Sequence, residues 1–137
     1  MAKLRHLAIA THDLDATTRF YVDSFDLARV RSFEARWGRG CVLTDGTISV
    51  SILEYFDTAA AGSERGTTFA GLHHIGFEVD DVDVCSRRVH GAGGQSRLDI
   101  SDALGIPDDA PIKEFEGPDG VVFDLGGPGV WTRDLGG

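Results

Sequence analysis

The sequence predicts an α+β fold built from two copies of one unit, each a strand, a helix and about three further strands (βαβββ). Three observations predict it: a segment repeated in the two halves, a helix-capping aspartate at the end of each repeat, and matching Asp-Gly turns before a late strand. The chain has 137 residues and is 42% hydrophobic. That length and composition suffice for one domain with an ordinary core.

The repeat pairs residues 4–15, LRHLAIATHDLD, with residues 72–83, LHHIGFEVDDVD. His6 is then equivalent to His74, so the offset between the copies is 74 − 6 = 68 residues. Apolar residues alternate in both segments, which is typical of a strand with one buried face. Alternation places each histidine opposite the apolar face that must pack on a helix.

A helix is predicted directly after each repeated strand. The equivalent aspartates Asp13 and Asp81 can each cap a helix by accepting backbone N–H bonds. Helical segments follow at residues 15–24 and 83–90, and the glycine-rich stretch 91–94 ends the second.

The later parts of the two copies also match. An Asp-Gly pair precedes a predicted strand at 48–53, and another precedes one at 121–125. Such pairs are typical of turns between strands. The offset here is 119 − 45 = 74 residues, so the second copy carries an insertion of 74 − 68 = 6 residues, which we place in a loop at 99–111.

The repeat defines the predicted domain organisation. We expect a single domain over residues 1–137, with module one at about 1–57 and module two at about 72–137. The small and polar residues of the linker, at about 58–71, indicate a connecting segment. Whether the modules pair within one chain or across a dimer stays open.

Charge and composition restrict the partners. The formal net charge of -9 disfavours binding to nucleic acid and to anionic membranes, because both repel it. No apolar run is long enough to span a bilayer, and the N-terminus turns polar too early for a signal peptide. Cys41 and Cys85 each stand alone, without a CxxC motif, so we expect reduced thiols and a cytoplasmic protein.

The duplicated histidines predict a metal site. Two like units packed with approximate twofold symmetry would bring His6 and His74 together, and two neutral imidazoles form half of a divalent site. Asp124 alternates with apolar residues that face the helix, and a carboxylate among such neighbours is disfavoured unless it is paired or bound to metal. The alternative is that all three are ordinary polar strand residues. Three protein ligands with open positions would suit Fe(II), and also Zn, Mn, Ni or Co.

The same alternation predicts the face of the strand to which three other polar residues point. Glu54 shares the parity of the apolar face, so we expect it to point away from the cleft unless a bulge intervenes. Ser51 faces inward, but serine is a poor divalent ligand. Glu78 has the parity of His74, which makes it a candidate outer ligand or catalytic base, the alternative being a solvated strand glutamate.

With the duplicated LRHLAIATHDLD and LHHIGFEVDDVD and the closing GPDGVVFDLGG, the chain resembles the vicinal oxygen chelate superfamily. That superfamily includes glyoxalase I, bleomycin-resistance proteins, methylmalonyl-CoA epimerase and extradiol dioxygenases. The resemblance covers nearly the whole chain, and it implies a curved mixed sheet around a cleft, often completed in a homodimer.

The resemblance also assigns ligands. His6 and His74 match the two histidine ligands of the family, and Asp124 stands where the family usually has glutamate. The remaining carboxylate or glutamine of glyoxalases and epimerases falls near Ser51, and this departure counts against a true glyoxalase I. Two histidines and one closing carboxylate are instead the pattern of the extradiol dioxygenases.

Two functions are therefore carried forward, and a purely structural or regulatory dimer module is a weaker third. The first is a metal-dependent lyase, isomerase or ring-cleaving dioxygenase that acts on a small molecule with neighbouring oxygens. The second is a metal-free binding or drug-sequestering protein with an aromatic-lined cleft. The aromatic residues available for such a lining are Phe33, Trp37, Phe69, Phe115 and Trp131.

Overall fold

A mixed sheet of eight strands, in the order β2-β3-β4-β1-β5-β8-β7-β6, organises the computed structural model, which describes residues 1–133. The strands are β1 (Lys3–Ala10), β2 (Ala28–Ala35), β3 (Gly38–Thr44), β4 (Ser49–Tyr55), β5 (Gly71–Glu78), β6 (Gln95–Ser96), β7 (Ile112–Glu116) and β8 (Val122–Gly126). The helices are α1 (Leu14–Phe25), α2 (Thr58–Ala61), α3 (Val82–Gly91) and α4 (Leu98–Leu104), with short 3-10 helices η1 (Gly66–Thr68) and η2 (Pro118–Gly120). Within the described residues, no helix is long and apolar enough to cross a membrane.

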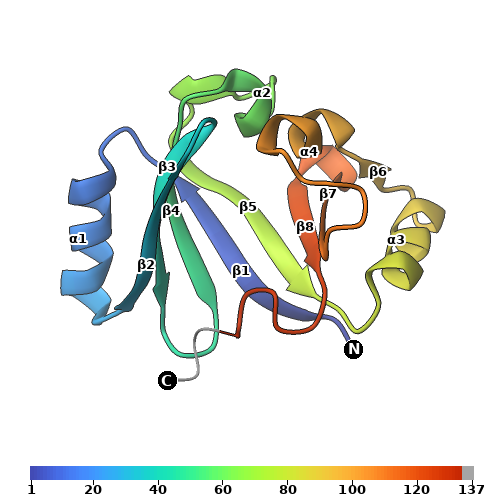
Figure 1. Cartoon of the computed structure of the whole chain (residues 1–137), viewed down its shortest axis with the longest axis horizontal. Coiled ribbons are helices and arrows are strands. Elements are labelled where there is room, and N and C mark those ends of the chain that lie inside the picture. Colours follow the sequence, from blue (N-terminus) through green and yellow to red (C-terminus); the bar gives the residue numbers. More distant parts are fainter. Residues whose placement is uncertain (134–137) are drawn as a thin grey trace.

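The two halves of the chain meet in the middle of the sheet. β1 pairs antiparallel with β5, and each of these strands pairs in parallel with the last strand of its own half, β4 or β8. The predicted α+β fold with a curved mixed sheet is confirmed (Figure 1). The pairing that the sequence left open is formed within one chain, and it makes the two histidine strands neighbours.

The predicted helices and their caps are confirmed. The carboxylate of Asp13 accepts the backbone N–H of Ala16 at the start of α1, and that of Asp81 accepts the N–H of Val84 at the start of α3. The two helices lie at opposite flanks of the curved sheet (Figure 1). Each covers a small core of its own half, formed by Leu14, Cys41, Leu43 and Ile52 under α1 and by Val79, Phe115 and Leu125 near α3.

The prediction of a loop at 99–111 was wrong in its first part. Residues 98–104 form α4, which ends at Gly105 in the left-handed region with φ of 74°. The apolar residues Leu98 and Ile100 are two positions apart, a spacing that does not predict a helix, and in the structure Ile100 is buried whereas Leu98 is largely exposed. Packing against α2 and β7 stabilises it instead. The connecting segment likewise contains a short helix, α2, capped by Asp57.

Replacing Asp13 or Asp81 with alanine should lower the free energy of unfolding by about 1 kcal/mol each, because a helical N–H loses its acceptor. Urea denaturation followed by circular dichroism measures the loss. Asp15→Ala is the matched control, since Asp15 lies in the first turn of α1 without being its cap. A loss for Asp15→Ala equal to that for Asp13→Ala would contradict the capping role.

Candidate metal centre

Three adjacent strands bring the predicted ligands together. His6 on β1 pairs with Gly76 on β5, and Gly76 pairs in turn with Asp124 on β8. His74 lies two residues before Gly76 and therefore shares its face of the sheet. A side chain at position 76 would clash with His6 and with Trp131, since a Cβ there would lie 2.8 Å from the Cβ of His6 and 2.9 Å from the Trp131 ring.

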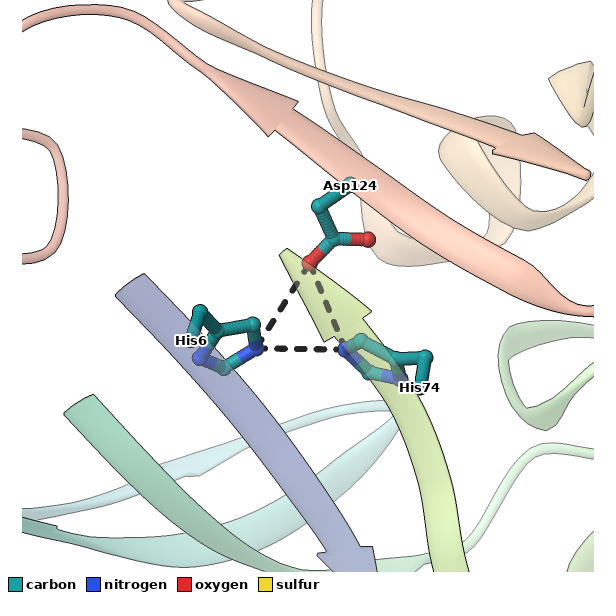
Figure 2. A group of neighbouring side chains, drawn as sticks. All are labelled: His6, His74 and Asp124. Atoms are coloured by element: carbon teal, nitrogen blue, oxygen red, sulfur yellow. Dashed lines mark hydrogen bonds and ion pairs between the residues drawn. The ribbon is translucent and has the colours of Figure 1, made fainter. Parts of the chain in front are cut away.

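The ligand atoms form a nearly regular triangle. The two histidine Nε2 atoms are 3.2 Å apart, and Asp124 Oδ2 lies 3.6 Å from Nε2 of His6 and 3.3 Å from Nε2 of His74. Figure 2 shows the three side chains pointing toward one another from their strands. An ion above such a triangle can lie about 2.0–2.2 Å from all three atoms, which is the distance range of histidine and carboxylate ligands on a divalent metal.

The chemistry of the three side chains also fits a cation. Burial, and then the neighbouring imidazole of His74, lowers the pKa of His6 to about 3, and burial lowers the pKa of His74 as well. Both rings are therefore neutral at pH 7 and carry a lone pair. Burial raises the pKa of Asp124 to about 6, and its Oδ1 has no hydrogen-bond partner within residues 1–133. A divalent ion would compensate this buried carboxylate.

The triangle opens into a cavity of about 260 Å³. Phe33, Trp37 and Trp131 line it, as do Tyr55 and Arg31. Phe69 and Phe115 do not line it: Phe69 packs under the Arg65 guanidinium, and Phe115 belongs to the buried core near α3. Three of the five aromatic residues considered from the sequence thus reach the cavity.

The first half of the chain supplies serine where the second supplies aspartate. Ala8 pairs with Ser51 just as Gly76 pairs with Asp124, so Ser51 occupies the position equivalent to Asp124 and lines the cavity. Glu54 points away, as alternation predicted, and its carboxylate binds Arg39 at 3.0 Å. The cluster of possible ligands found among the described residues has three members, His6, His74 and Asp124.

Glu114 is a cavity residue that the sequence analysis missed. It lies on β7 directly opposite Asp124 and is only 5% exposed. Burial, and then the adjacent Asp124 carboxylate, raises the pKa of Glu114 well above its ordinary value, so this carboxyl is the protonated member of the pair. Alternation of Glu114 with the apolar Phe115 was the signal that could have indicated a cavity-facing residue. A glutamate in an acidic chain is, however, ordinarily interpreted as a solvated residue.

Glu78 does not line the cavity. Its Oε1 accepts hydrogen bonds from the backbone N–H of Gly129 at 3.1 Å and from the hydroxyl of Thr132 at 3.2 Å. These bonds hold the segment that carries Trp131, whose ring stacks on His6 with centroids 5.1 Å apart and planes 3° apart. Glu78 is thus in contact with a wall of the cavity rather than with the three converging atoms.

Comparison with known proteins gives a family. A family model described as the Glyoxalase/Bleomycin resistance protein/Dioxygenase superfamily matches residues 3–125. No match was found among curated proteins.

Solved structures of similar fold cover nearly the whole chain. A hypothetical protein from Bacillus halodurans has a TM-score of 0.69 and 21% identity, covering 92% of this chain and 94% of its own. A methylmalonyl-CoA epimerase in complex with methylmalonyl-CoA has a TM-score of 0.70 and 23% identity, with 96% and 97% covered. The epimerase from Mycobacterium tuberculosis has a TM-score of 0.66 and 20% identity, with 91% and 87% covered. At these identities the similarity shows the fold.

Glu78→Ala should release Trp131 and shift its fluorescence to longer wavelength, because the segment loses two hydrogen bonds. The measurement uses a Trp37→Phe background, in which Trp131 is the single tryptophan left of two. Glu78→Gln keeps the Oε1 acceptor and should retain the original emission. Identical spectra for the alanine and parent proteins would rule out the anchoring role.

Proposed function

Because this chain belongs to the Glyoxalase/Bleomycin resistance protein/Dioxygenase superfamily, we propose that it is a divalent-metal-dependent enzyme acting on a small molecule with two neighbouring oxygen atoms. The convergence of His6, His74 and Asp124 on one point at a cavity wall carries this proposal. We assign these three side chains as the metal ligands. Two histidines and one carboxylate are a ligand set used by Fe(II), Zn, Mn, Ni and Co.

The strand next to that of His6 supplies no strong fourth ligand. Ser51 stands at the position equivalent to Asp124, and a neutral hydroxyl there does not compete well for a divalent ion. When bound, the ion would supply Lewis-acid chemistry, polarising two neighbouring substrate oxygens and stabilising an enediolate-like or catecholate-like anion. A lyase, isomerase or ring-cleaving dioxygenase reaction on a substrate with neighbouring oxygens can each start from such an anion.

Two further side chains can handle protons at the substrate. Glu114 lines the cavity beside Asp124 as a protonated carboxyl, so it can donate a hydrogen bond to a developing anionic oxygen. Burial raises the pKa of Tyr55, so its hydroxyl also remains a donor. We propose Glu114 and Tyr55, ahead of Glu78, as the residues that exchange protons with substrate.

The outer part of the cavity suits an anionic molecule with an apolar body. Phe33 and Trp37 form an aromatic wall that excludes water from the substrate. Arg31 is the one cationic side chain among the described residues that line this cavity, and its guanidinium lies over Phe33. We propose that Arg31 pairs with a carboxylate or a similar anionic group of the substrate.

The same aromatic wall favours a second candidate, a metal-free protein that binds or sequesters a small molecule. The two candidates differ in metal content, since a binding protein of this kind needs no stoichiometric ion. The buried Asp124 carboxylate, which has no cationic side chain paired with it among the described residues, favours the enzyme.

Metal-free protein titrated with Zn²⁺ or Co²⁺ in a calorimeter should bind one ion per chain. His6→Ala and Asp124→Ala should each weaken binding by more than roughly 100-fold, because outer partners of ligands alone contribute 10–100-fold. His90→Ala is the control, since His90 binds Ser96 at the surface. Equal weakening by His90→Ala, or no binding by the parent protein, would refute the assigned site.

Turnover should depend on the ion. Metal-loaded protein is screened against small anionic 2-oxo, 2-hydroxy and catechol compounds, and any activity found should be lost with a chelator and in His74→Ala. Activity that survives both the chelator and the His74→Ala substitution would show that the metal has no role in the reaction. Tight binding of a compound by the metal-free protein, without turnover, would favour the sequestering candidate.

A further inference from the structure

Two adjacent histidines on β5 are hydrogen-bonded to each other behind the triangle. Nδ1 of His73 lies 2.8 Å from Nδ1 of His74, and Nε2 of His73 lies 2.8 Å from the carbonyl oxygen of Ala61. His73 is 3% exposed, and Ala61, at the end of α2, is 1% exposed. A chain of contacts therefore runs from the connecting segment through His73 to a proposed ligand.

A bulge makes this contact possible. Neighbouring side chains of a regular strand point to opposite faces, so His73 and His74 should not meet. The register between β1 and β5 shifts at this point: Ala8 pairs with His74, but Ile9 pairs with Leu72, which leaves His73 as the extra residue. A bulge re-aims a side chain in this way. Arg65 donates a hydrogen bond to the carbonyl of His73 and holds the bulged backbone.

The acceptors around His73 determine where its proton lies. A carbonyl oxygen can only accept, so the short contact with Ala61 requires the N–H of a neutral His73 to be on Nε2. Both partners of this buried ring are uncharged, a carbonyl and an imidazole, and no carboxylate is hydrogen-bonded to it among the described residues, which favours the neutral form. Nδ1 of His73 is then an acceptor, and Nδ1 of His74 must donate to it.

We infer that His73 is a positioning residue that fixes His74 in the tautomer protonated at Nδ1, leaving the Nε2 lone pair aimed at the point between His6 and Asp124. This inference rests on the proposed metal site for its consequence. The Ala61 carbonyl fixes His73, and His73 fixes both the proton and the ring orientation of His74. The metal-binding nitrogen is thereby prepared before an ion arrives.

The first half of the chain has no histidine equivalent to His73. Arg5 occupies the position equivalent to His73, and Nδ1 of His6 has no side-chain partner among the described residues, the backbone of Ser49 being the hydrogen-bonding group near that ring. The two equivalent histidines therefore differ: His74 is held by a relay of two hydrogen bonds, whereas His6 is held by packing against Trp131. Loss of His73 should consequently act through His74 alone.

Long-range proton–nitrogen correlation NMR of the metal-free parent protein tests the relay directly, because it identifies which ring nitrogen carries the proton. We expect the proton on Nε2 of His73 and on Nδ1 of His74. A proton on Nε2 of His74 would overturn the inference. This measurement needs no variant and no bound ion.

Cobalt(II) affinity tests the consequence. His73→Leu removes the acceptor and should weaken Co²⁺ binding by about 10–100-fold. His73→Asn places a carbonyl oxygen near the position of Nδ1, and it should restore affinity to within about threefold of the parent. His12→Leu is the matched control, because His12 also binds a backbone carbonyl of the connecting segment, that of Thr68, and should leave affinity unchanged.

Equal affinities for the parent and His73→Leu proteins would overturn the positioning role, as would a loss in His73→Asn as large as that in His73→Leu. Circular dichroism establishes that each variant is folded before titration. Failure of the parent protein to bind Co²⁺ refutes the proposed function instead, and the NMR measurement then decides the tautomer independently.

Discussion

The antiparallel pairing of β1 with β5 places two equivalent histidines side by side, and the candidate site depends on that contact. Each strand carries its histidine on the face opposite the helix of its own half. Edge-to-edge pairing then joins the two cavity faces into one. β8 lies next to β5 and adds Asp124 in the same row, while Gly76, which has no side chain, leaves room for His6 and the Trp131 ring.

Burial gives this contact its chemistry. Removal from water lowers the pKa of the two imidazoles and raises the pKa of the Asp124 carboxyl. Asp124 and Glu114 face each other across β7 and β8, so one proton shared between them leaves one negative charge at the triangle. Neutral nitrogen donors around a single buried carboxylate are the environment that a divalent cation stabilises.

The duplicated framework supports a site that is not symmetric. Ser51 replaces the second carboxylate, and His73 supports one histidine but has Arg5 as its equivalent in the other half. The segment that carries Trp131 adds a wall on one side, and it follows the residues that match the family. The repeat supplies strand positions, whereas the residues that differ between the halves supply the features that distinguish the two ligand histidines.

The sequence by itself determined the duplicated unit, its two capped helices and the strand faces of His6, His74 and Asp124, because alternation and capping are local properties of the chain. The tertiary structure alone decided the pairing of β1 with β5 within one chain and the packing that forms α4. It also decided the roles of Glu114, His73 and Trp131. These depend on register between distant strands, on a bulge that breaks alternation, and on a segment that folds back from beyond β8, none of which leaves a periodic signal in the sequence.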